Sequence, residues 1–254
     1  MRIAAGAASA WIAGALAAQA GAFNPEAGRG LAILTSGFAD APAYRDASGR
    51  LFKAPGYRKF ETILHVEYGL TPWLAFIARP RFVATRLDAS PALSDHGLGA
   101  SEIGAQAQIL RADRFVLAAQ ALARIPGGRR SPLFDRGGGG EARLMAGASF
   151  ELAGRPAFAE AHVALRRRDG GRKDEALIDA TLGWRPFAPL MLMLQSFTTT
   201  ETSGPRPANW TKAQASAVWD VNANWSVSLA GFVTLHASRA PRERGVILGV
   251  WRRF

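Results

Sequence analysis

The sequence contains no cysteine, which excludes disulfide bonds and thiolate metal sites. Beyond residue 20 it also lacks a long apolar run. The best candidate, residues 190–194, is far shorter than the ~20 residues that a transmembrane helix needs. Basic residues outnumber acidic ones by 31 to 20, a net charge of +11, yet they are scattered and no recognition motif accompanies them. Composition therefore argues against a disulfide scaffold, a helical membrane protein and a nucleic-acid-binding protein.

The first twenty residues have the pattern of a secretory signal peptide. Arg2 supplies the positive start, residues 3–16 are almost wholly apolar, and Ala18-Gln19-Ala20 is an A-x-A cleavage signal. The alternative is an N-terminal membrane anchor, but the stretch is short for a span and no basic stop follows it. We predict export, cleavage after Ala20, and a single domain over residues 21–254.

The rest of the chain repeats stretches of about ten alternating residues, each followed by a connector rich in Gly, Pro, Asp, Asn or Arg. This spacing is typical of membrane β-strands. The predicted strands are 30–38, 57–68, 74–85, 100–110, 115–125, 141–151, 157–167, 175–184, 190–202, 209–221, 225–237 and 242–254.

The connectors alternate in length. Short ones fall at 69–72, 111–114, 152–156, 185–189 and 222–224, and mostly longer ones at 39–56, 86–99, 126–140, 168–174, 203–208 and 238–241. Outer-membrane barrels have short periplasmic turns, longer outside loops and both termini in the periplasm, which needs an even strand count. We therefore predict an all-β fold, a transmembrane antiparallel up-and-down β-barrel of about 12 strands in the outer membrane.

Alternation within the strands separates two faces. In the second strand one face carries Phe60, Thr62, Leu64, Val66 and Tyr68, and the other carries Lys59, Glu61, Ile63, His65 and Glu67. A soluble sandwich would turn the apolar face to a core, whereas a barrel turns it to lipid. Aromatics beside the short turns favour the barrel, because they suit a girdle at the membrane interface: Tyr68, Trp73, Phe115, Trp184, Trp219 and Trp225.

The chain ends on a strand whose last residue is Phe254. This tail resembles those of bacterial outer-membrane proteins, which the barrel-assembly machinery reads. It departs from them in having Arg252 two places before the end, with Trp251 one place further in. The departure leaves the register of the last strand open.

Four segments carry a narrower resemblance: Gly21-Ala22-Phe23-Asn24-Pro25-Glu26-Ala27-Gly28-Arg29-Gly30, Tyr57-Arg58-Lys59-Phe60-Glu61, Glu67-Tyr68-Gly69-Leu70-Thr71-Pro72-Trp73, and Gly97-Leu98-Gly99-Ala100-Ser101-Glu102-Ile103-Gly104. They are similar to XagA-like, transporter-type outer-membrane proteins of proteobacteria. The resemblance covers about the first half of the chain and implies a barrel rather than a particular activity. It supplies no catalytic residues.

The predicted register gathers both signs of charge on the inner face. The candidate lumen and solute-binding residues are Lys59, Glu61, His65, Glu67, Arg79, Arg81, Glu102, Arg124, Arg143, Glu160, His162 and Arg166. The same face is predicted to hold Gln106, Gln108, Gln120, Asp179, Gln195, Gln214, Asp220 and His236. These groups could pair and hold a narrow barrel shut. They could also form a transverse field along a pathway for small polar solutes, with the arginines favouring anions such as acidic sugars.

Two other classes of function stay open. A twelve-stranded lipid hydrolase would need a Ser activated by His; no histidine lies in a nucleophile motif, although Ser94-Asp95-His96 could form a triad-like loop. A non-conducting accessory barrel for surface polysaccharide export would leave the same sequence pattern.

A divalent metal could bind to Glu61, His65 and Glu67, or to Glu160 and His162, but an ion-pair network is the simpler interpretation. No cofactor is predicted, and the Gly137–Gly140 run is expected to be a flexible outside loop because it lacks a following Lys-Ser or Lys-Thr.

Overall fold

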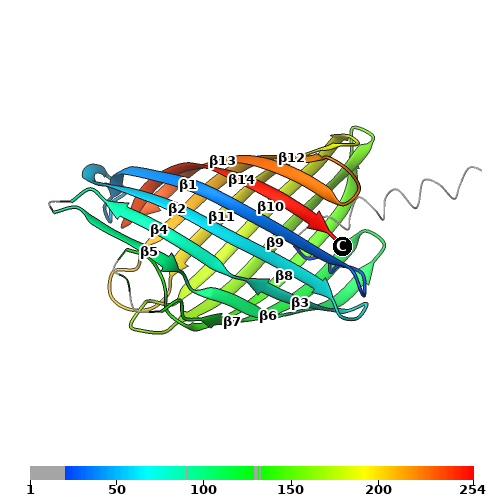
Figure 1. Ribbon diagram of the computed structural model, residues 1–254, viewed down its shortest axis with the longest axis horizontal. Helices are drawn as coiled ribbons and strands as arrows, with labels where there is room; N and C mark the ends of the chain where they lie inside the picture. Colours follow the sequence, from blue (N-terminus) through cyan, green and yellow to red (C-terminus); the bar gives the residue numbers. More distant parts are fainter. Residues whose placement is uncertain (1–20, 90, 129–130, 132) are drawn as a thin grey trace, which may run out of the picture.

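The computed structural model describes residues 21–254, apart from 90, 129–130 and 132, and it is a closed antiparallel β-barrel (Figure 1). The predicted signal peptide lies outside the described residues. Within them, no helix has the length and apolar character to cross a membrane. The strands are β1 Gly30–Arg45, β2 Leu51–Gly69, β3 Leu74–Arg79, β4 Arg81–Leu87, β5 Leu93–Leu98, β6 Ser101–Ala112, β7 Phe115–Ile125, β8 Gly139–Leu152, β9 Arg155–Arg168, β10 Glu175–Phe187, β11 Leu190–Glu201, β12 Asn209–Asp220, β13 Trp225–Ser238 and β14 Ala240–Arg253.

Two pairs of these segments each form one barrel strand, so the wall has 12 strands, as the sequence predicts. β3 and β4 are separated only at Pro80, whose missing N–H interrupts the ladder, and both pair with β2. β5 and β6 are separated at Gly99 and Ala100, and they pair with β4 and β3 respectively.

Two predicted long connectors are wrong. β1 and β2 continue pairing past residue 38 and from residue 51, which leaves only a turn at 46–50. Most of 86–99 is strand as well, because β5 pairs with β4 over Leu93–Leu98. The sequence pattern missed these extensions because they are rich in polar and small residues and lack the apolar alternation of a strand in lipid. Backbone hydrogen bonds to neighbouring strands hold them in the sheet.

The barrel closes where β1 pairs with both β2 and β14. Gly30 and Phe254 exchange backbone hydrogen bonds of 2.7 and 3.0 Å, and the Phe254 ring stacks on Tyr68 at 6.4 Å. A Cβ on Gly30 would lie 2.4 Å from the Phe254 ring, so glycine makes room for the terminal aromatic. The last strand therefore turns Phe254 and Arg252 outward and Trp251 inward; Arg252 lies over the Trp225 ring.

One end of the barrel carries the short turns and both ends of the barrel domain (Figure 1). The turn between β8 and β9 is a two-residue hairpin in which Ala153 and Gly154 have φ of 52° and 67°. Positive φ at both positions is the type I′ geometry that matches the twist of the flanking strands.

The outer surface is apolar along most of the wall, and one group of exposed aromatic residues lies at the short-turn end. Exposed outward side chains there include Tyr68, Trp73, Phe115, Trp219 and Trp225. Mid-wall positions carry exposed aliphatic side chains such as Leu144, Val163, Ile178 and Leu248. An exposed apolar surface of this extent is unfavourable in water and suits an acyl environment.

Candidate functional site

The structure places all twelve candidate lumen residues on the inner face, where none is exposed. The glutamines, Asp179 and Asp220 that were predicted beside them also face inward or lie half-buried. His236 is the exception and corrects the prediction. A register shift opposite Thr211 and Lys212 leaves Leu235 unpaired, so His236 is exposed and its ring contacts Asn209 Oδ1 at 3.0 Å.

One inner wall, from β6 to β10, is crossed by a network of arginines and carboxylates. At its centre Arg166 on β9 reaches Glu141 at 2.6 Å, Glu175 at 3.2 Å and Glu102 at 3.8 Å. Glu102 lies on β6, three strands away from Arg166, so this group spans the curved wall. Multiple partners offset the cost of taking these charges out of water.

Arg143 extends the network in one direction and Arg79 in the other. Arg143 contacts Asp179 at 2.5 Å and Glu141 at 3.0 Å. Arg79 contacts Glu102 at 3.5 Å and donates from Nε to His65 Nδ1 at 2.8 Å. With Nδ1 accepting from Arg79, His65 Nε2–H donates to Glu67 Oε1 at 2.6 Å. Nine of the twelve candidate residues therefore form one connected polar layer, and Lys59, Glu61 and Arg81 lie outside it.

A smaller charged group lies toward the long-loop end of the barrel. Lys59 contacts Glu61 at 3.2 Å, Arg81 contacts Glu61 at 3.5 Å, and Lys212 pairs with Glu243. Lys59, Glu61 and Lys212 line a luminal cavity of about 190 Å³. Two ammonium groups and one carboxylate therefore face this cavity.

The opposite inner wall is neutral around a second luminal cavity. This cavity, of about 230 Å³, lies between Glu160 and His65 on one side and the walls of β10 to β14 and β1 on the other. Its neutral lining includes Thr181, Met193, Gln195, Gln214, Ser216, Ser228 and Trp251. The Trp251 indole donates to Ser228 at 3.0 Å, and Gln214 donates to Gln195 at 2.9 Å. A charged wall therefore faces a hydroxyl, amide and aromatic wall.

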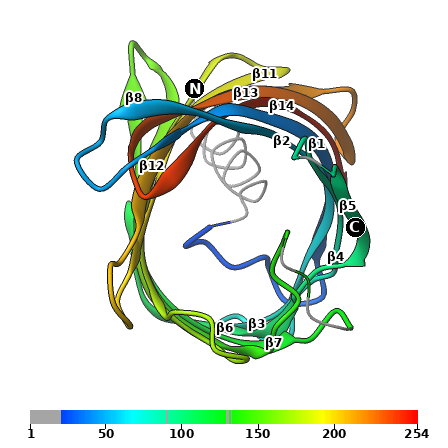
Figure 2. The ribbon, with the colours of Figure 1, turned by 90° about the vertical axis from the view of Figure 1, so that its left-hand side faces the viewer.

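The N-terminal segment 21–29 folds into the lumen at the short-turn end, which the strand pattern did not predict (Figure 2). Ala22 and Phe23 are buried against Val116, Ala118 and Met145. Further along, Gly28 donates to Gly69 at 2.8 Å and anchors the segment beside β2. One feature of the sequence is consistent with this position: directly after the cleavage signal, residues 21–23 are apolar and Asn24 is uncharged.

The connector between β7 and β8 bends inward at the other end (Figure 2). Its Asp135 contacts Arg124 at 2.9 Å, Arg172 donates to the Ser131 and Phe134 carbonyls, and Tyr57 on β2 donates to the Leu133 carbonyl at 3.2 Å. Burial alone would raise the pKa of Asp135. The backbone N–H of Gly137 and the neighbouring guanidinium groups more than offset this, so its pKa lies below the ordinary 3.8.

This connector is called the mouth loop, and its described residues are 126–128, 131 and 133–138. Part of the expected flexible glycine run is instead ordered wall, because β8 begins at Gly139 and pairs there with Arg168 and Arg124. The lumen is thus narrowed by protein at both ends, by the N-terminal segment and by the mouth loop.

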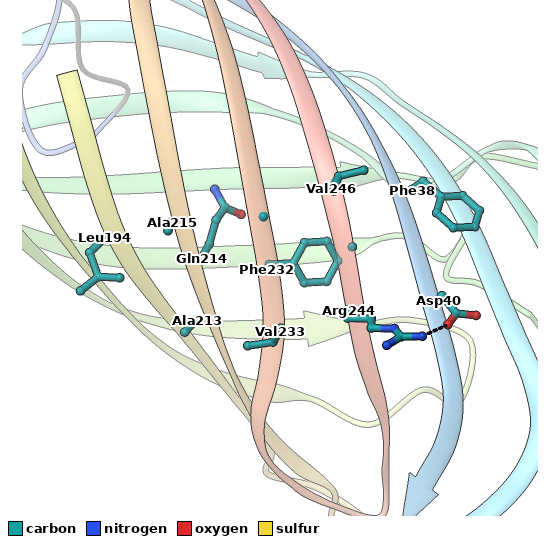
Figure 3. A pocket seen from close by; sticks show the side chains of 12 residues that line it. Phe38, Asp40, Leu194, Ala213, Gln214, Ala215, Phe232, Val233, Arg244 and Val246 are labelled. Carbon is teal, nitrogen blue, oxygen red and sulfur yellow. Dashed lines mark hydrogen bonds and ion pairs between the residues drawn. The ribbon is translucent and has the colours of Figure 1, made fainter. Parts of the chain in front are cut away.

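A hollow of about 670 Å³ lies in the outer face of the wall over β11 to β14 and β1 (Figure 3). Small residues at Ala213, Ala215, Gly231 and Gly245 create it, and an exposed Arg244–Asp40 contact of 3.4 Å lies at its edge. Phe38, Gln214 and Phe232 line both this hollow and the 190 Å³ luminal cavity. The β13–β14 ladder also ends here, at Val233 and Arg244, although both strands continue.

The triad-like cluster does not form. Ser94 and His96 lie on the exposed face of β5, whereas Asp95 between them faces the other way and contacts Arg136 at 2.9 Å. Over the described residues, no three His, Asp or Glu side chains are arranged to hold a metal ion. In the first candidate metal group Glu61 contacts Lys59 and Arg81 instead, and His65 hydrogen-bonds to Glu67 at 2.6 Å. In the second, His162 lies 3.5 Å from Glu160.

No protein-family model matches the chain, and no curated protein matches it. Solved structures do. The COG4313 outer membrane channel from Pseudomonas putida F1 superposes with a TM-score of 0.71 at 15% identity, covering 93% of this chain and 99% of that one. The β domain of the Bordetella autotransporter BrkA gives 0.54 at 13% identity, covering 90% and 100%, and the porin NanC gives 0.53 at 8%, covering 86% and 98%. The fold is therefore that of outer-membrane β-barrels.

Proposed function

We propose that the chain is an outer-membrane channel for small polar solutes with a weak preference for anions. The observation that carries the proposal is the lumen itself: a connected charged wall faces a neutral hydrogen-bonding wall across a cavity of about 230 Å³, and a second cavity of about 190 Å³ lies beside Lys59 and Lys212. A barrel whose lumen is closed by side chains would not need unfilled polar cavities. The P. putida outer membrane channel has the same fold over nearly its whole length, which supports the proposal.

The preference for anions rests on the cavity near the mouth loop. The arginines of the large network are paired with carboxylates, so they contribute little net field. The group around the 190 Å³ cavity is also paired, but Lys59, Arg81 and Lys212 face only the carboxylates of Glu61 and Glu243, which leaves one positive charge in excess. A local excess of positive charge in a narrow space selects the sign of a permeating ion.

Export and assembly form part of the same proposal. Cleavage after Ala20 would release the barrel domain, and β14 with its terminal Phe254 would be the strand that the assembly machinery reads. The membership of the XagA-like group also stays a proposal. Two segments that carry the resemblance contact each other: the first contains Gly28 as well as Gly21–Asn24, which enters the lumen, and the Glu67–Trp73 segment contains Gly69, which binds Gly28.

Planar-bilayer recordings of the purified protein test the proposal. We expect small current steps whose reversal potential in a KCl gradient is displaced toward the anion value. Lys212→Gln should shift that potential toward the cation value, whereas Lys53→Gln, on the exposed start of β2, should leave it unchanged. Shortening the mouth loop, by deleting residues 129–134, should enlarge the steps. No current from either the wild type or the shortened variant would overturn the channel and favour a non-conducting accessory barrel.

The outer hollow favours a second route for apolar molecules. The hollow and the 190 Å³ luminal cavity share Phe38, Gln214 and Phe232, and they meet where the β13–β14 ladder ends. Phe232→Ala should then increase uptake of a small apolar dye into vesicles. Unchanged dye uptake in a folded variant would exclude the lateral route.

A further inference from the structure

Glu160 on β9 is a buried luminal carboxylate with an unusual set of partners. Its side chain is 3% exposed, it accepts from the Ala22 backbone N–H at 3.1 Å, and its other oxygen lies 3.5 Å from His162 Nε2. Over the described part of the chain no Lys or Arg forms an ion pair with it, unlike Glu102, Glu141 and Glu175 in the neighbouring network. A buried carboxylate without a cation is costly, so a positive partner is expected.

The residue that touches this carboxylate is Gly21. A Cβ on Gly21 would lie 2.1 Å from Glu160 Oε2 and 2.4 Å from Oε1, so the Gly21 backbone abuts both oxygens. Any larger residue at this position would displace the carboxylate. Glycine is thus required by close approach rather than by backbone conformation.

The segment around Gly21 is held by a specific set of contacts. Gln106 donates from Nε2 to the Gly21 carbonyl at 2.8 Å and to Asn24 Oδ1 at 2.9 Å, and Gln120 in turn donates to Gln106 Oε1 at 2.9 Å. Phe23 fits where β8 has Gly147, whose Cβ would lie 2.8 Å from its ring. The lumen wall is therefore shaped to position the chain at residue 21.

We propose that Glu160 is the counter-ion of the α-ammonium group of Gly21, which export processing creates. Hydrolysis of the Ala20–Gly21 bond adds the hydroxyl of water to the Ala20 carbonyl carbon and a proton to the Gly21 nitrogen. The released amine, with an ordinary pKa of about 7.7–8.0, takes a further proton from solvent at neutral pH. The resulting ion pair locks residues 21–24 as a plug at the short-turn end. This inference rests on cleavage after Ala20 and not on channel activity.

The test is the reactivity of the α-amine in the folded mature protein, with the N-terminus first established by intact mass. An amine-reactive ester is added over a range of pH, and labelling of the N-terminal peptide is followed by mass spectrometry. At pH 6.5, well below the pKa of the amine, we expect the wild type to label about tenfold more slowly than Glu160→Gln, as for one unit of pKa. Glu243→Gln, which removes a buried luminal carboxylate at the other end of the barrel, should label like the wild type.

Gly21→Ala should also label faster, because its Cβ displaces Glu160. Should Glu160→Gln fail to fold, Glu160→Asp keeps the charge but withdraws it by one methylene, and should label at an intermediate rate. Equal labelling of the wild type and folded Glu160 variants would overturn the ion pair. A mature mass that does not begin at Gly21 would overturn it as well, whatever the bilayer recordings show.

Discussion

The orientation of the wall can be tested with one arginine placed in its outer face. Leu144 lies on β8, is 52% exposed and points away from the lumen between the inward-facing Arg143 and Met145. If its surroundings are acyl chains, Leu144→Arg should destabilise the barrel by about 2–4 kcal/mol, the cost of a cation near the bilayer midplane. This corresponds to about a 30- to 900-fold change in the unfolding equilibrium constant. In a water-exposed face the same change would cost under about 0.5 kcal/mol.

The structure supplies the depth that this magnitude needs. β8 runs from Gly139 to Leu152, and Leu144 lies near its middle. At a rise of about 3.3 Å per residue and a tilt of about 40°, Leu152 is roughly 20 Å from Leu144 along the membrane normal. That exceeds half of a hydrocarbon layer about 30 Å thick. Leu152→Arg, at a position that is 45% exposed, is therefore the matched control and should cost about 0–1 kcal/mol.

Reversible guanidinium unfolding in lipid vesicles, followed by the fluorescence of the six tryptophans in residues 21–254, measures both variants. The expected result is a loss of stability confined to Leu144→Arg, with the same denaturant dependence in both. Equal and small losses at the two positions would refute the assignment of the outer face to lipid. The lumen, the pore and the plug would then lose their physical basis together.

Three further changes probe local features. Ala153→Gly should stabilise the barrel by about 1 kcal/mol in the same unfolding assay, because Ala153 has a φ of 52° that glycine adopts freely; Gly154→Ala should do the opposite. Gly183→Ala should cost about 1–3 kcal/mol, because its Cβ would lie 1.8 Å from the Phe158 ring; a neutral result would mean that the ring moves aside freely. Asp135 has a lowered pKa, so its contribution is complete above its ordinary pKa of 3.8 and is lost as the pH falls through the lowered value. Asp135→Asn should therefore expose the mouth loop to protease at pH 7, where the wild type is protected, and equal protection would contradict the tether.

Much of the wall could be predicted from the sequence because alternation is a local property. Successive residues of a strand point to opposite faces whatever their partners are, so the inner position of Glu61, His65 and Arg166 followed from counting along each strand. The same counting failed at His236, where one unpaired residue in β13 shifts the faces. It also missed the outer halves of β1 and β2, whose pairing does not depend on an apolar face.

The sequence by itself determined that the chain forms a closed barrel, how many strands the barrel has and which residues face inward or outward. It also determined that the C-terminus lies at the short-turn end of the barrel. Only the tertiary structure decided which charges meet, since Arg166 and Glu102 are far apart in the chain and come together through the curvature of the wall. It alone brought Gly21 against Glu160 and bent the mouth loop inward. The physical reason is that strand alternation is written residue by residue, whereas contacts across a lumen depend on how every strand is staggered against the next.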